Sequence, residues 1–126
     1  PGTDRHHRQL LRNLSFRGKS SYAAPEVHDV GSAIDPSACD IFSLGCTLFV
    51  MLTGRAFIEP GMDPSSRPRF RALLRADFDG LFAGIEDDVL SLSARHLIRG
   101  MTHPDPFRRL RLEQVMVHPW VLGRMD

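Results

Sequence analysis

The chain has 126 residues, of which 42% are apolar and 25% are charged, and its formal net charge is +1. This length fits one domain or a part of one, with a core that buries about two-thirds of the unfolded chain's surface. The composition is typical of a globular protein, and the small net charge argues against a strongly basic nucleic-acid-binding protein.

Residues 1–22 are polar and basic and show no hydrophobic period, which predicts a loop. The arginines of RHHRQLLRNLSFRGK leave a nucleic-acid-binding arm as an alternative. His6 and His7 are adjacent, so their side chains face different directions and no metal site is expected there. The opening PGTDRHHRQ lacks a signal-peptide pattern and suggests part of a longer protein.

The clearest predicted helix lies in DPSACDIFSLGCTLFVMLTG. Asp35 suits the N-cap, Pro36 the first helical position and Gly54 the position after the last turn. Apolar residues surround nearly the whole axis, which predicts a buried core helix. The unbroken apolar stretch is shorter than the roughly 20 residues that cross a membrane, so no membrane span is expected.

Asp40 places a carboxylate in this predicted core helix, where burial is costly unless the oxygens accept hydrogen bonds. Two interpretations stay open. Asp40 either caps free amide groups near the helix start, or it binds backbone from another segment.

Two cysteines, Cys39 and Cys46, lie on one face of the same helix. Seven residues of helical rise separate them by roughly 10 Å, too far for a disulfide bond. Buried free thiols are typical of a reducing compartment, so an intracellular, cytoplasmic location is expected.

Shorter helices are predicted further along. RAFIEPGMDPSSRP predicts a loop, a short helix with Phe70, Leu73 and Leu74 on one face follows, and DFDGLFAGIEDD predicts a connection. Apolar residues then recur at helical spacing: Leu90, Ala94, Leu97, Ile98 and Met101.

Asp87 or Asp88 could cap that helix, THPDP ends it, and a last short helix covers 112–117. No strand is predicted. The expected fold class is therefore mainly α, with about four helices joined by long proline-rich loops.

Three motifs now stand in order: GKSSYAAPE at 18–26, DIFSLG at 40–45 and DPFRRL at 105–110, the last followed by EQVMVHPWV. Together they resemble the later half of the C-terminal lobe of a eukaryotic-type serine/threonine protein kinase. In that family an activation segment ends in Ala-Pro-Glu, a central helix carries Asp-x-Trp-Ser-x-Gly, and an arginine follows Asp-Pro-x-x. The resemblance implies a partial kinase domain over 1–126, with the activation segment and substrate-docking loop in 1–26 and the helical core in 36–122.

The resemblance gives Glu26 a partner. In the family the glutamate of Ala-Pro-Glu pairs with the arginine of Asp-Pro-x-x-Arg, which is Arg109 here. A planar guanidinium binds a carboxylate through two parallel hydrogen bonds, so the pair would form a structural clamp across the sequence. Arg108 is expected to be solvated.

The resemblance also implies roles for other residues. Asp40 would brace the backbone of a catalytic loop upstream of this chain. A loop that docks the protein substrate would consist of Gly18, Lys19, Ser20, Ser21 and Tyr22.

Some residues depart from the family pattern. Lys19 replaces a threonine that helps align the catalytic aspartate and lysine, and Phe42 replaces the tryptophan of the central helix. His96 stands where a helix aspartate is common, and Arg111 where a threonine often follows. Lys19 alone bears on the chemistry.

The sequence lacks the glycine-rich phosphate loop, the Val-Ala-x-Lys strand, the His-Arg-Asp loop and the Asp-Phe-Gly motif that phosphoryl transfer needs. ATP and Mg²⁺ are therefore expected to bind the full-length kinase through residues upstream, and the isolated chain is expected to be inactive. The alternative is a non-catalytic, pseudokinase-like module that binds regulatory proteins through the loops around 60–68.

Overall fold

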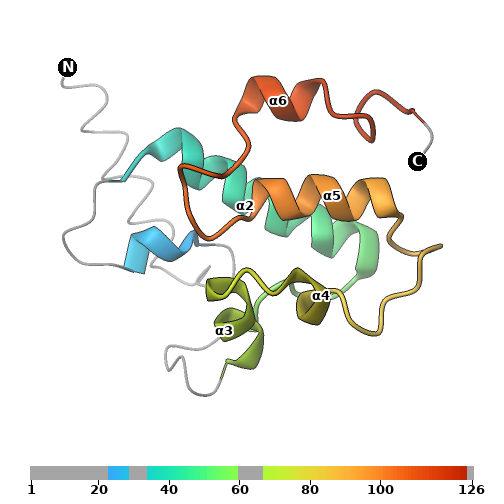
Figure 1. The fold of residues 1–126 in the computed structure, drawn as a ribbon, viewed down its shortest axis with the longest axis horizontal. Helices are drawn as coiled ribbons and strands as arrows, with labels where there is room; N and C mark the ends of the chain where they lie inside the picture. The colour runs from blue at the N-terminus through green and yellow to red at the C-terminus, as the bar shows by residue number, and fades with distance from the viewer. Residues whose placement is uncertain (1–22, 29–33, 60–66, 125–126) are drawn as a thin grey trace.

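The computed structural model describes residues 23–28, 34–59 and 67–124, and all its regular elements are helical (Figure 1). A single-turn 3-10 helix, η2, spans Pro25–His28. Five α-helices follow in the described residues: α2 (Pro36–Thr53), α3 (Pro68–Leu74), α4 (Phe78–Leu81), α5 (Leu92–Met101) and α6 (Leu112–Met116). The prediction of a mainly α fold is confirmed.

Helix α2 has the predicted bounds because local chemistry sets both ends. The carboxylate of Asp35 accepts a hydrogen bond from the Ser37 N–H at 3.0 Å, and Pro36 occupies the first helical position. Gly54 adopts a left-handed conformation (φ 72°), and its N–H donates to the Val50 carbonyl at 2.7 Å.

The core lies where α2 meets α5, and α3 packs against α4 beside it (Figure 1). The larger cluster of buried residues gathers around Phe49, whose ring centroid lies 5.1 Å from that of Phe57 and 6.2 Å from that of Phe82. A smaller cluster joins α2, α5 and α6, and the half-buried Trp120 packs against both clusters.

Gly45 permits the close approach of α2 and α5. A Cβ atom there would lie 2.7 Å from Cγ2 of Thr102 and 2.9 Å from Cβ of Met101. Both distances are shorter than real Cβ contacts allow, so the glycine of DIFSLG is required by packing rather than by backbone conformation.

The prediction that α2 is buried all round is wrong. One stripe of α2 is exposed, and we call it the α2 outer face: Ser37, Asp40, Leu44, Thr47 and Met51. Leu44 is 48% exposed and Met51 is 76% exposed, because no described segment covers this side. By length and hydropathy α2 could also cross a membrane, but its other side is buried in the protein core.

Two details between α3 and α5 also differ from expectation. A short helix, α4, forms within the predicted connection, because the Asp77 carboxylate accepts from the Gly80 N–H at 3.0 Å. Helix α5 is capped by Ser91, whose hydroxyl accepts from the Ala94 N–H at 3.1 Å, rather than by an aspartate. Asp87 instead forms an ion pair with Arg95 at 3.2 Å.

Candidate functional site

The candidate site lies where η2 meets the loop between α5 and α6. Pro25 begins η2 and Glu26 lies in its first turn. Arg109 follows α5, and its backbone N–H donates to the Asp105 carbonyl at 3.1 Å, which folds DPFRR into a turn. The two side chains approach from segments 83 residues apart in sequence.

Arg109 and Glu26 form a buried bidentate ion pair. Nη1 of Arg109 donates to Oε2 of Glu26 at 2.7 Å, and Nη2 donates to Oε1 at 2.9 Å. The Arg109 side chain is 0% exposed and that of Glu26 is 7% exposed. The structure thus brings together the two residues that the resemblance pairs.

The same guanidinium also binds two backbone carbonyls. Nη1 donates to the Ala38 carbonyl at 2.9 Å, and Nε donates to the His103 carbonyl at 2.9 Å. Arg109 therefore joins η2, the first turn of α2 and the end of α5. Because a buried charge is costly without hydrogen bonds, these contacts are what make its burial tolerable.

Two residues that sequence reasoning did not assign to the site support this pair. Phe42 is fully buried, and its ring centroid lies 5.0 Å from Cζ of Arg109, so the aromatic ring at the family's tryptophan position faces the cation. Cys39, three residues earlier, directs its Sγ at Oε2 of Glu26 at 3.6 Å. Cys39 and Phe42 are three residues apart, which places them on one face of the helix. This spacing was the sequence signal that both could lie beside the same partner.

Both cysteines are free and buried, as expected. Burial, with the neighbouring charge of Glu26, raises the pKa of the Cys39 thiol to about 12. Burial also raises the pKa of Cys46. Neither thiol is a nucleophile in this environment.

Asp40 does not lie where the sequence predicts. It is exposed on the α2 outer face, and no hydrogen bond or ion pair joins it to any residue that the structure describes. The cap of α2 is Asp35, so the capping interpretation of Asp40 is wrong. Its burial was inferred from an all-round apolar helix, and that side of the helix is open.

Gly18, Lys19, Ser20, Ser21 and Tyr22 lie outside the described residues. Arg108 is exposed, as predicted, with Nε 3.8 Å from the Asp105 carboxylate.

A cavity of about 680 Å³ adjoins the ion pair. One wall is the first half of α2, including Asp40 and Leu44, and the other runs from 106 to 114 and includes Arg109. The α2 outer face thus opens into a concave surface directly beside the Glu26–Arg109 pair.

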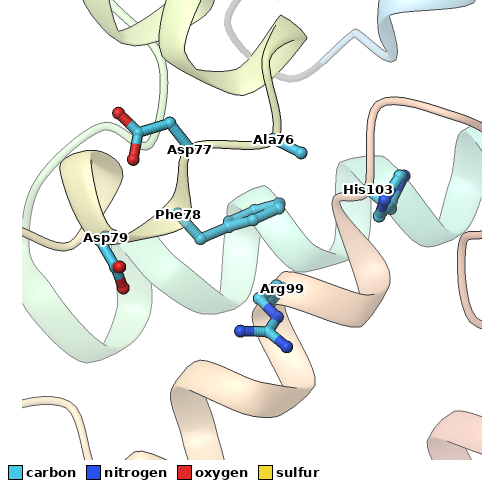
Figure 2. A pocket seen from close by; sticks show the side chains of 6 residues that line it. All are labelled: Ala76, Asp77, Phe78, Asp79, Arg99 and His103. Carbon is cyan, nitrogen blue, oxygen red and sulfur yellow. The ribbon is translucent and has the colours of Figure 1, made fainter.

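A second cavity, of about 310 Å³, lies between the α3–α4 turn and α5 (Figure 2). Figure 2 shows the Phe78 side chain lying between the turn at Ala76 and the α5 residue Arg99. His103 closes one end, where its Nδ1 accepts from the Asp105 N–H at 3.0 Å, and burial lowers the pKa of His103. Two carboxylates, Asp77 and Asp79, and one guanidinium, Arg99, also line this cavity.

Comparison with known families identifies the chain. The model of the protein kinase domain matches residues 3–121. The chain belongs to the protein kinase domain family. This kinase sequence is part of such a domain, the later half of its C-terminal lobe, as the resemblance implies.

Curated relatives of this kinase sequence are serine/threonine kinases. It is 34% identical over 116 residues to a putative ribosomal protein S6 kinase alpha-2 of Caenorhabditis elegans, covering 90% of this chain and 15% of that protein. It is 38% identical over 108 residues to ribosomal protein S6 kinase alpha-6 of Mus musculus, covering 83% of this chain and 13% of that protein. The chain thus spans a small part of the relatives' length.

Solved kinase structures share the fold. The Rad53 kinase domain with SCD2 is 26% identical, has a TM-score of 0.61, and matches 82% of this chain and 37% of that chain. The twitchin kinase region of C. elegans is 27% identical, with a TM-score of 0.60, over 82% of this chain and 17% of that chain.

Kinase chemistry requires bound ATP and divalent metal. In the described part of the chain, no group of three or more His, Cys, Asp or Glu side chains is placed to hold a metal ion.

Proposed function

We propose that this chain is the substrate-side part of a serine/threonine protein kinase that transfers the γ-phosphate of ATP to protein hydroxyl groups. The observation that carries the proposal is the Glu26–Arg109 pair, which fixes the end of the activation segment to the helical core. This ion pair matters for substrate docking, because the residues that precede Glu26 can hold a substrate in a fixed position only if the C-terminal end of their segment is anchored.

The docking role of 18–22 follows from their place in the chain. Only two described alanines, Ala23 and Ala24, separate Tyr22 from Pro25, and both are buried. The described residues that follow Tyr22 are therefore packed in the core. Its hydroxyl and cationic groups are suited to holding a protein segment beside the residue that receives phosphate.

The position of Asp40 supports its proposed role, which is to bind the backbone of the catalytic loop. Its carboxylate is exposed, has no described partner and lines the 680 Å³ cavity beside the ion pair. A segment with free backbone N–H groups could fill that cavity and bind it. We propose that this segment, and the residues that bind ATP and Mg²⁺, belong to an upstream part of the protein; one relative, Rad53, was solved in complex with AMP-PNP.

We further propose that 1–26 contains the activation segment and the substrate-docking loop, and that 36–122 forms the helical core. We also propose an intracellular location, with protein substrates and regulatory proteins as partners. The two buried free thiols support a reducing compartment.

A second candidate is a non-catalytic, pseudokinase-like binding module. Lys19, in place of the threonine that helps align catalytic groups, is the observation that favours it. Such a module would keep the clamp and the fold but transfer no phosphate.

A phosphotransfer assay separates the candidates. The full-length polypeptide, incubated with γ-labelled ATP and a mixed protein substrate, should label serine and threonine, whereas the 126-residue chain should label nothing. Labelling by the short chain, or labelling of tyrosine alone, would contradict the proposal. A full-length protein that binds partners but transfers no phosphate would establish the pseudokinase reading, and a Lys19→Thr variant then tests whether this residue is responsible.

A further inference from the structure

Two histidines from different helices contact each other beside the last segment of the chain. Nδ1 of His96, on α5, lies 2.8 Å from Nε2 of His118, which follows α6. The ring centroids are 5.1 Å apart, with an angle of 31° between the planes. His118 is 7% exposed, whereas His96 is exposed.

A backbone contact fixes the hydrogen positions. The N–H of Trp120 donates to Nδ1 of His118 at 3.1 Å, so that nitrogen must keep its lone pair. The hydrogen of neutral His118 therefore lies on Nε2 and donates to Nδ1 of His96. Both nitrogens of His118 are thus used, one as acceptor and one as donor.

Neither ring can take up a proton without losing a contact. If the hydrogen bond between the rings is kept, three hydrogens on the pair require one on Nδ1 of His118, where it would oppose the Trp120 N–H. Four hydrogens place two N–H groups against each other across 2.8 Å. The first proton thus breaks either the hydrogen bond from the Trp120 N–H or the contact between the rings, and the second proton breaks both.

The charged groups around the two rings are mixed in sign, and none of the described carboxylates contacts either ring. Arg95 and Arg99 are the charged neighbours of His96 along α5, and Asp79 of α4 lines the same cavity. On α6, Glu113 is engaged with Arg111 at 2.8 Å. Within the described residues no hydrogen bond or ion pair connects either imidazole to a carboxylate.

A defined segment follows the ring contact in the chain. After His118 the chain makes a turn in which the Leu122 N–H donates to the His118 carbonyl at 3.0 Å and the Gly123 N–H donates to the Trp120 carbonyl at 3.2 Å. The Trp120 side chain packs against both core clusters. Figure 1 shows this segment, in red, running beyond α6 on the side of α5.

We propose that His96 and His118 form a pH-sensitive latch, which holds residues 118–124 against α5 while both rings are neutral and releases them when the pair takes up protons. Burial and the neighbouring His96 lower the pKa of His118, in agreement with this latch. A lowered pKa means that the stabilisation is present above the ordinary histidine pKa of about 6.5 and is lost as pH falls below it.

Hydrogen–deuterium exchange, resolved by peptide, tests the latch in the full-length polypeptide. Protection of 118–124 is measured relative to α5 at about pH 7.5 and about pH 5.5, since the internal reference cancels the intrinsic pH dependence of exchange. We expect relative protection to fall by about tenfold or more, because one linked proton changes an equilibrium tenfold per pH unit. Equal relative protection at both values would overturn the proposal.

Variants make the test specific. His96→Asp places an acceptor that pairs with protonated His118, so the loss of protection on acidification should become several-fold smaller. His96→Asn keeps the acceptor and removes one titrating group, so it should give a loss between the two and serves if the aspartate variant does not fold. The control, His103→Asn, alters another histidine outside the latch and should behave like the original chain. A His96→Asp protein that loses protection as fully as the original would overturn the proposal.

Discussion

At Arg109, one side chain satisfies four hydrogen bonds to three separate segments. Arg108, next to it, has a side chain that is 76% exposed and one long ionic contact. Adjacent arginines of identical chemistry thus differ entirely in environment, because the turn at DPFRR directs one inward and one outward. This contrast gives a matched pair for mutagenesis.

The Arg109→Leu variant should lose about 3–5 kcal/mol of unfolding free energy, because Glu26 is left buried without its partner. The control variant Arg108→Leu should change it by less than about 0.5 kcal/mol, as expected of an exposed group. Urea denaturation followed by circular dichroism measures both. Similar losses for the two variants would show that the pair has no special role.

The thiols give a second prediction at this scale. At pH 8 neither Cys39 nor Cys46 should react with a disulfide reagent such as DTNB in the folded protein, because burial raises the pKa of both. Both should react in urea. Absorbance of the released thiolate counts the reacting groups, and one fast equivalent before unfolding would contradict the burial of these side chains.

Among the elements, the contact of α2 with α5 depends on the absence of a side chain at Gly45. In most helix interiors Gly→Ala stabilises by roughly 1 kcal/mol through helix propensity. Here the new methyl group meets Cβ of Met101, which is attached to backbone and cannot rotate away. Packing therefore outweighs propensity.

The Gly45→Ala variant should lower the melting temperature, with a net loss of about 1–3 kcal/mol from overpacking. The control is Gly100→Ala in α5, where the added Cβ meets the side chain of Leu110, which can change rotamer. That variant should lose less. A more stable Gly45→Ala protein would mean that α2 and α5 lie further apart than the structure shows.

The helix bounds that could be predicted are those set by capping residues adjacent to the helix in sequence. Asp35, Pro36 and Gly54 gave the bounds of α2. The cap of α5 was missed because three polar residues precede that helix, and only packing decides that Asp87 pairs with Arg95 while Ser91 caps. The Glu26–Arg109 pair came from family resemblance, since no local pattern joins residues so far apart.

At the scale of the whole molecule, the main wrong prediction from the sequence is that α2 is covered on all sides. Burial depends on neighbouring segments, so an apolar helix predicts only that some partner covers it. In this chain Leu44, which lines the 680 Å³ cavity, and Met51, further along the same face of α2, remain exposed. Phe107, 96% exposed, adds to the apolar surface on the far wall of that cavity.

The isolated 126-residue chain should therefore be marginally stable and self-associate through this surface. A variant with Leu44→Lys and Met51→Lys should remain monomeric at higher concentration, by light scattering, without loss of helix content. The control Ile41→Lys changes a residue that is 5% exposed and should unfold the chain. A sharp melt of a monomeric original chain at high temperature would contradict the expectation.

The central claim is that Glu26 and Arg109 act as one unit that fastens the activation segment to the helical core. A double-mutant cycle tests it directly, with Glu26→Gln, Arg109→Leu and the combined variant measured by urea denaturation. The claim predicts that the combined variant loses less than the sum of the two single losses, with a coupling free energy of about 2–3 kcal/mol. Losses that add to within about 0.5 kcal/mol would show that the two residues act independently and would contradict it.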